Sequence, residues 1–231
     1  MKYKNNNLKF NQNKYGGSWK ICLQESRLKK VEKLISQILP GKMLDIGCAG
    51  GDFSRKFIKK GCQVFGLEIN IDKVKEANKK GLLCKQGDVE KKLPYTANYF
   101  DLLFAGELIE HIFDTTAFLK ETHRLLKPKG RLILTTPNIA SLENKIRILL
   151  GWQPIWVDFR AELSSGHIRA YTYQALKSQL ETLGFYIEKR LGNFVSPHQL
   201  RWNDLNTVGL SKLGDWMPAI SQDMIIQAIK L

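Results

Sequence analysis

The feature that most constrains the fold is a regular alternation of short apolar runs and amphipathic segments between residues 43 and 138. The apolar runs have the length of strands, and they occupy residues 43–47, 63–69, 81–87, 99–106 and 131–138. The segments between them carry apolar residues at helical spacing, and they occupy residues 53–61, 71–81 and 115–130. Strands that alternate with helices in this way form a parallel sheet with helices on both faces.

The flanking segments extend this pattern. A helix is predicted from residue 18 to the Pro40-Gly41 pair, which ends it. After Asn138 the alternation stops, and a helix at 143–151 is followed by a tryptophan-rich loop. A helix at 171–184 and strands at 184–191 and 223–231 complete the chain, whereas residues 192–222 are not placed by any pattern. No internal repeat or low-complexity linker divides the chain, so a single domain is expected.

The composition limits which partners and which cellular compartment we expect for the protein. The formal net charge is +14 over 231 residues, which is compatible with an acidic partner or with a lysine-rich solvated surface. The lysines are spread along the chain, so nucleic acid is possible but not favoured. The four cysteines match no zinc pattern and no paired framework, and the polar N-terminus is not a signal peptide. We expect a cytoplasmic protein with free thiols, no membrane span and an undetermined oligomeric state.

The sequence MLDIGCAGGD links the first predicted strand to the following helix. Ligands of open α/β sheets bind at the carboxyl ends of strands, and glycines such as Gly47 and Gly51 let a backbone approach a ligand closely. A dinucleotide fingerprint needs a third glycine where Asp52 and Phe53 follow. Asp45, just before the turn, would repel a pyrophosphate but would suit the cationic amino acid end of S-adenosylmethionine (SAM). SAM is therefore favoured over NAD.

The segment LDIGCAGG is similar to the first motif of class I SAM-dependent methyltransferases, with Ala49 in place of the middle glycine. Further segments resemble later motifs of this family in the same order, and they are VFGLEIN, KQGDVEKKLPY, FDLLFAGELIEHI and LLKPKGRLILTTPN. The resemblance is strong over residues 40–138 and weak over 166–190. It implies a Rossmann-like, doubly wound α/β fold with a mostly parallel seven-stranded sheet and an antiparallel last strand.

The resemblance also implies roles for the residues at the strand ends. Asp45, Gly47, Cys48 and Gly51 would form the turn that holds SAM. Glu68 would accept the ribose hydroxyls and Ile69 would pack on the adenine, while a solvated strand end is the alternative for Glu68. The adenine contacts would come from Asp88 and the backbone of Val89, unless Asp88 only forms an Asx turn.

The residues after the fourth strand should face the methyl group. Ala105, Gly106 and Glu107 would line the methionine part of SAM, and Arg27 could pair with its carboxylate. Methyl transfer is an in-line displacement, so the enzyme mainly aligns the reactants, and a general base helps when the acceptor is a hydroxyl. We predict His111, Glu110 and His167 as the catalytic residues.

The same residues allow a second interpretation. Glu107, Glu110 and His111 share one helical face, and they resemble the E-x-x-E-H of ubiquinone-biosynthesis and small-RNA methyltransferases, two metal-linked groups. His167 is a possible fourth ligand. A divalent metal is possible but not favoured, because many similar enzymes with Glu-His after this strand need none.

Four segments are predicted around this centre. Residues 1–18 form a mobile arm, 25–138 the SAM-binding core, 139–170 an insertion over the substrate, and 171–231 the C-terminal helix and strands. Within the insertion, Trp152, Trp156 and Phe159, together with Tyr171, form either an aromatic wall or ordinary core. His123 is expected on the surface, His198 is unplaced, and the Cys48 thiol is expected to be buried.

The sequence thus favours a methyltransferase with a small-molecule acceptor, methylated most readily on oxygen. An RNA methyltransferase is the runner-up, supported by the charge and by the E-x-x-E-H motif. A non-catalytic partner subunit with the same fold is the third reading, and the intact first motifs argue against it.

Overall fold

The structure is a computed structural model of the whole chain, and it describes residues 26–38, 40–157, 166–195 and 207–231. The predicted arm at 1–18 lies outside these residues, as do Phe159 and His198. The division of the chain into arm, core, insertion and C-terminal part remains a proposal.

A seven-stranded sheet forms the centre of the molecule, in the order β3-β2-β1-β4-β5-β7-β6. The strands are β1 (Lys42–Ile46), β2 (Gln63–Glu68), β3 (Leu83–Gln86), β4 (Phe100–Gly106), β5 (Leu126–Pro137), β6 (Phe185–Gly192) and β7 (Asp223–Lys230). All neighbours pair in parallel except β7, which is antiparallel to both β5 and β6. The predicted fold class, including the antiparallel last strand, is confirmed.

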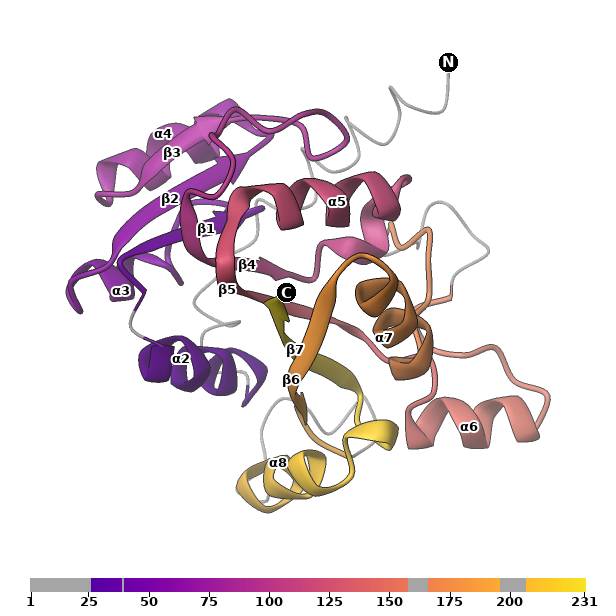
Figure 1. Cartoon of the computed structure of the whole chain (residues 1–231). Coiled ribbons are helices and arrows are strands. Elements are labelled where there is room, and N and C mark those ends of the chain that lie inside the picture. The colour runs from indigo at the N-terminus through magenta and orange to yellow at the C-terminus, as the bar shows by residue number, and fades with distance from the viewer. Residues whose placement is uncertain (1–25, 39, 158–165, 196–206) are drawn as a thin grey trace.

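Helices lie against the two faces of the sheet (Figure 1). The α-helices are α2 (Ser26–Ile38), α3 (Arg55–Ile58), α4 (Ile71–Lys79), α5 (Thr115–Leu125), α6 (Leu142–Leu149), α7 (Tyr173–Thr182) and α8 (Thr207–Trp216). Two 3₁₀ turns add to them, η2 (Ile109–His111) and η4 (Pro218–Ile220). The sheet order reverses between β1 and β4, which makes the carboxyl ends of these two strands the switch point where ligands bind in such folds.

The strands divide their side chains between two cores. In β7, Met224, Ile226 and Ala228 belong to the cluster that α5 and α7 cover, whereas Ile225 belongs to the cluster that α2, α3 and α4 cover. Successive residues of a strand point to opposite faces, so a strand that is apolar at every position must be buried on both. This explains the continuous apolar runs in the sequence.

Two helices end earlier than the sequence pattern predicts. The helix expected at 115–130 ends at Leu125, and β5 begins at Leu126. Pro128 disfavours helical backbone at the preceding residue, and Lys129 adopts a φ of 62°, which breaks the helix. The helix expected at 53–61 is reduced to the single turn α3, Arg55–Ile58.

The unplaced connection contains a helix that the sequence did not indicate. Helix α8 carries a glycine, Gly214, near its end, and glycine weakens helices. A Cβ atom at Gly214 would lie 2.9 Å from the backbone of Asn193 and Phe194. The glycine therefore allows α8 to pack directly on the chain that leaves β6. None of the described helices is long and apolar enough to span a membrane.

The central position of β7 leads to a prediction about stability. Ile225 is fully buried between β5 and β6, so Ile225→Ala should lower the free energy of unfolding by about 2–5 kcal/mol, through lost burial and the remaining cavity. The matched control is Leu231→Ala at an exposed position, which should change it by less than about 0.5 kcal/mol. Urea unfolding measures both variants, and equal effects would contradict the placement of β7.

Candidate active site

The predicted cofactor turn follows β1 at the switch point. Gly47 and Gly51 both adopt a φ of 76°, a region that favours glycine, and the amide groups of Gly47 and Cys48 donate to the Leu67 carbonyl at 2.8 and 3.2 Å. Ala49 has a φ of 46°, so the alanine at the family's glycine position is left-handed too. That conformation costs a residue with a Cβ about 1 kcal/mol, which the surrounding contacts must offset.

Asp45 lies beneath this turn as a buried carboxyl group. Its exposed fraction is 4%, and its Oδ2 accepts a hydrogen bond of 2.5 Å from the Ser54 hydroxyl. Burial raises the pKa of Asp45 to about 7, and the neighbouring negative charge of Glu68 acts in the same direction. A positive charge beside this carboxyl would therefore be strongly favoured.

Glu68 joins the ends of β1 and β2. Its Oε2 accepts from the Ala49 amide at 2.9 Å, and its Oε1 accepts from the Asn70 amide at the same distance. The side chain thus fixes the glycine-rich turn as well as the start of α4. A carboxylate has about four acceptor positions, so Glu68 can still accept ribose hydroxyls.

The third predicted contact, Asp88, follows β3. Its Oδ1 accepts from the Glu90 amide at 2.9 Å, which is the Asx turn considered as its alternative role. Its side chain lies at the same sheet edge as Glu68, because β2 and β3 are parallel neighbours. Val89 is half-buried against the core, and Ile69 is half-buried after β2. The adenine contacts of Asp88, Val89 and Ile69 remain predictions.

A buried charge network lies at the ends of β4 and β7. The Arg27 Nη1 atom is 2.9 Å from Oε2 of Glu107 and 3.3 Å from Oδ2 of Asp223. The other oxygen of Glu107 accepts from the Thr135 hydroxyl at 3.0 Å, and Glu107 has a φ of 51°. Arg27 is therefore not simply solvated: it connects α2 to the carboxyl edge of the sheet, where Ala105 and Gly106 end β4.

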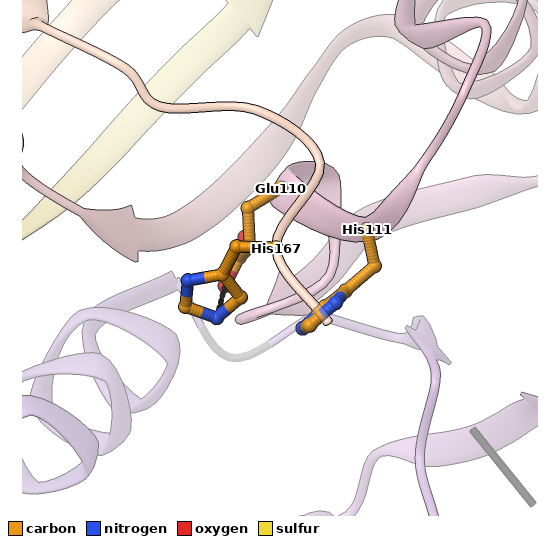
Figure 2. A group of neighbouring side chains, drawn as sticks. All are labelled: Glu110, His111 and His167. Atoms are coloured by element: carbon orange, nitrogen blue, oxygen red, sulfur yellow. Dashed lines mark ion pairs between the residues drawn. The ribbon is translucent and has the colours of Figure 1, made fainter. Parts of the chain in front are cut away.

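The three predicted catalytic residues come together (Figure 2). Glu110 and His111 belong to η2, while His167 comes from the last part of the predicted insertion 139–170. The rings of His111 and His167 are 4.8 Å apart, and His167 Nε2 is 4.0 Å from Glu110 Oε1. The Gly166 carbonyl is 2.9 Å from His111 Nδ1. If Nδ1 carries the proton of a neutral ring, Nε2 is the basic nitrogen.

Glu110 is almost completely buried, with an exposed fraction of 1%. Its Oε2 accepts from the Thr136 hydroxyl at 3.0 Å, and its Oε1 has no hydrogen-bond partner among the described residues. Burial, followed by the charge of Glu107, raises the pKa of Glu110 well above its usual value. The ligand atoms of Glu110, His111 and His167 lie within 4.8 Å of one another, so small movements would let them hold a divalent ion.

The described residues of the predicted aromatic wall lie in different places and do not form one surface. Trp156 contacts the ring of His167 at 5.6 Å, and both line a cavity of about 10 Å³, room for roughly one water molecule. Trp152 is exposed, whereas Tyr171 is buried in the core and its hydroxyl bonds to Gln179. Of the described aromatic residues considered for the wall, only Trp156 lies beside the histidines.

Two further candidate residues, Cys48 and His123, pack against neighbouring side chains. The Cys48 thiol is buried as expected and lies 3.5 Å from Cys84 Sγ, a contact that, with burial, raises its pKa. His123 is half-buried, with its ring against that of Phe185, so it is less exposed than expected. The helix pattern showed only that His123 has charged neighbours, and the strand it packs on is far along the chain.

The sequence analysis missed the partners that hold the site residues. Ser54, Thr136 and Asp223 bond to Asp45, Glu110 and Arg27, respectively. At the paired ends of β5 and β7, Asp223 lies opposite Pro137, the residue after Thr136. Their position at strand ends is the only sequence signal that could have pointed to them.

Comparison with known proteins places this geometry in a family. A family model described as a methyltransferase domain matches residues 23–190. The human mitochondrial ubiquinone biosynthesis O-methyltransferase is 28% identical over 175 residues, covering 72% of this chain and 47% of the relative. The corresponding protein of Bartonella bacilliformis is 28% identical, covering 70% of this chain and 66% of its own length. This chain spans about half the length of several curated relatives that it matches.

Solved structures show the same fold. A SAM-dependent methyltransferase from Thermotoga maritima superposes with a TM-score of 0.65 at 20% identity, covering 89% of this chain and 88% of that one. Another from Archaeoglobus fulgidus gives a TM-score of 0.64 at 19% identity, with coverages of 96% and 99%. The family model matches well over half of the sequence. The chain belongs to the class I SAM-dependent methyltransferase family.

Proposed function

We propose that this protein transfers a methyl group from SAM to a small-molecule acceptor, and that the accepting atom is oxygen. The observation that carries the proposal is the excess of carboxyl groups at one edge of the sheet. Asp45 and Glu68 lie at the ends of β1 and β2, and Glu107 and Asp223 share the guanidinium of Arg27, in a chain whose net charge is +14. An acidic site in a basic protein favours a cationic ligand.

The residues present fit SAM. The left-handed turn from Gly47 to Gly51 leaves the backbone open for close approach, and Asp45 lies under it with a pKa raised by burial. Glu68 would hold the ribose, while Glu107 would face the cationic end of the cofactor. When bound, SAM supplies an electrophilic methyl group on a sulfonium. The chain itself must orient the acceptor, exclude water and remove the acceptor's proton.

His111 is the proposed general base. The Gly166 carbonyl at 2.9 Å fixes the ring through Nδ1, which directs Nε2 to the acceptor. His167 and the buried Glu110, whose ligand atoms lie within 4.8 Å of that of His111, would help to position the acceptor. The relatives that are called ubiquinone biosynthesis O-methyltransferases support oxygen as the accepting atom.

The ionisation of Asp45 gives a prediction about stability and binding. A folded pKa of about 7, above the usual 3.8, means that the native state holds this proton more tightly than the unfolded state. Asp45 therefore destabilises the fold increasingly as the pH rises from about 4 to 7. Asp45→Asn should remove this loss, making the ligand-free protein more stable above pH 7 by up to about 4 kcal/mol.

The same variant should bind S-adenosylhomocysteine, the product form of the cofactor, much more weakly. Thermal unfolding at pH 5 and pH 8 measures the stability, and calorimetry measures the binding. A variant that loses stability at both pH values would contradict the prediction that the ionised Asp45 side chain destabilises the fold.

Glu68 gives a second prediction. Glu68→Ala removes both the ribose acceptor and the bond to the Ala49 amide, so the dissociation constant for S-adenosylhomocysteine should rise at least about tenfold. Asp72→Asn is the matched control, because Asp72 is an exposed acid on the first turn of α4. Isothermal titration calorimetry compares the two. Unchanged affinity of the Glu68 variant would remove Glu68 from the cofactor site.

A third prediction separates base catalysis from metal catalysis. His111→Ala should lower kcat by about 10²–10⁴ while the affinity for S-adenosylhomocysteine stays within about twofold. We also propose that activity survives EDTA, because proton removal by His111 needs no metal ion. Activity lost in EDTA and restored by a divalent ion would instead favour the metal role of Glu110, His111 and His167.

The acceptor class has its own test. Methylation of short catechols or phenols by the wild-type protein, followed by mass spectrometry, would support the oxygen assignment. Transfer only to RNA, together with RNA binding that weakens with salt, would overturn the small-molecule assignment. Binding of S-adenosylhomocysteine with no transfer to any acceptor would favour a non-catalytic partner subunit.

A further inference from the structure

Residues 166–169, which include His167, run along the turn η2 (Figure 2). The amides of Ile168 and Arg169 both donate to the Glu110 carbonyl, at 2.9 and 3.3 Å. Because both bonds meet at one carbonyl, a further contact is needed to fix how this segment is oriented on the turn.

The Arg169 side chain supplies that contact, next to His111 in the sequence. Its Nε atom donates to the Ile112 carbonyl at 3.2 Å, and its Nη2 atom donates to the Phe113 carbonyl. A guanidinium presents its donors as a planar fork, and hydrogen bonds from a charged donor are stronger than those between neutral groups. The two residues that follow His111 are therefore held by the segment that carries His167.

The same stretch is held from its amide side by Glu90. One carboxylate oxygen of Glu90 accepts from the Phe113 amide at 2.5 Å, and the other accepts from the Asp114 amide at 3.4 Å. Glu90 belongs to the loop after β3, so these bonds connect the stretch to the edge of the sheet. Arg169 thus binds carbonyl groups that are fixed independently of it, and it can hold its own segment in place through them.

The position of this segment decides which nitrogen of His111 is basic. A carbonyl oxygen only accepts hydrogen bonds, so the Gly166 carbonyl, 2.9 Å from His111 Nδ1, requires a proton on that atom. A neutral ring with its proton on Nδ1 has its lone pair on Nε2. Because Gly166 and Arg169 belong to the same short segment, a displacement of Arg169 would carry this carbonyl away from the ring.

We propose that Arg169 is a positioning residue for the methyl transfer, which holds the Gly166 carbonyl against the His111 ring and so keeps Nε2 basic. This inference rests on the proposed role of His111 as the general base. A displacement of about 1 Å in an active site can cost about 10²-fold in rate. A side chain that touches neither cofactor nor acceptor can therefore control the reaction through the group that it positions.

A purely structural role is the alternative, and Arg124 shows what such a role looks like. Its Nη2 atom donates to the Tyr95 carbonyl at 3.0 Å. Arg124 lies at the end of α5 and contacts the chain before β4, at the edge of the sheet opposite the histidines. Arg169, in contrast, lines the cavity that Trp156 and His167 also line.

Kinetics of the whole chain, with a short catechol as acceptor, test the proposal. Arg169→Ala should lower kcat by about 10–10²-fold, while the acceptor KM and the dissociation constant for S-adenosylhomocysteine stay within about twofold. Arg169→Lys should fall between this variant and the wild type, because an ammonium keeps the charge but lacks the fork. The matched control, Arg124→Ala, should keep kcat within about twofold. Wild-type kcat in Arg169→Ala would overturn the proposal.

A double-variant cycle shows whether Arg169 acts through His111. In a His111→Ala background, Arg169→Ala should change the residual kcat by less than about twofold, since the group that it positions is gone. The same loss in both backgrounds would show a general structural role and overturn the proposal. A His111→Ala variant with wild-type kcat would overturn the general base of the proposed function, and this inference with it.

Nitrogen NMR of the histidine rings gives a readout that needs no acceptor. The neutral His111 ring of the wild type should carry its proton on Nδ1, and Arg169→Ala should move a measurable part of the population to the tautomer protonated on Nε2. Arg124→Ala should leave the signals of this ring unchanged, and circular dichroism checks that both variants fold. An unchanged tautomer in Arg169→Ala would overturn the proposal, whether or not the catechol is methylated.

Discussion

The hydrogen bonds of Glu68 are the interaction on which the site depends. One carboxylate fixes the amide of Ala49 in the turn after β1 and the amide of Asn70 before α4. It thereby sets the relative position of two loops that come from neighbouring strands. The left-handed backbone of Ala49 persists because this bond and the two bonds to Leu67 hold the turn from both sides.

The fold keeps several carboxyl groups at a cost in stability. Asp45 and Glu110 are nearly inaccessible, and burial raises the pKa of both. A protein selected for stability alone would place apolar side chains at such positions. These two groups lie at the carboxyl edge of the sheet with Glu107 and Asp223. Functional sites commonly keep groups of this kind even though they lower the stability of the fold.

Much of the fold could be predicted from the sequence, because buried parallel strands and amphipathic helices leave strong periodic patterns. Asp45, Glu68 and Asp88 lie at or just after strand ends, where the strand pattern and the resemblance to methyltransferase motifs placed them. The end of α5 at Leu125 was missed because the stop signals in the sequence are Pro128 and Gly130, whereas the chain already turns into β5 at Leu126. Helix α8 was missed because Gly214 serves a close packing contact that local propensity cannot express.

The ion pairs of Arg27 were the part of the candidate site that the sequence predicted least well. Arg27 was identified as a candidate partner of the cofactor, but its contacts to Glu107 and Asp223 depend on tertiary packing. The Arg27–Asp223 bond joins residues that are 196 positions apart. Such a contact leaves no local pattern, and its closure requires nearly the whole chain to be ordered.

The long separation in sequence also affects when, during synthesis of the chain, the Arg27 ion pairs can form. A ribosome releases α2 well before β7, so the guanidinium of Arg27 can meet Asp223, 196 positions later, only after the intervening residues have been made. Until β7 inserts between β5 and β6, the edge that gathers the carboxyl groups is incomplete. The nascent protein therefore cannot complete this carboxyl-rich edge before β7 has been made and has entered the sheet between β5 and β6.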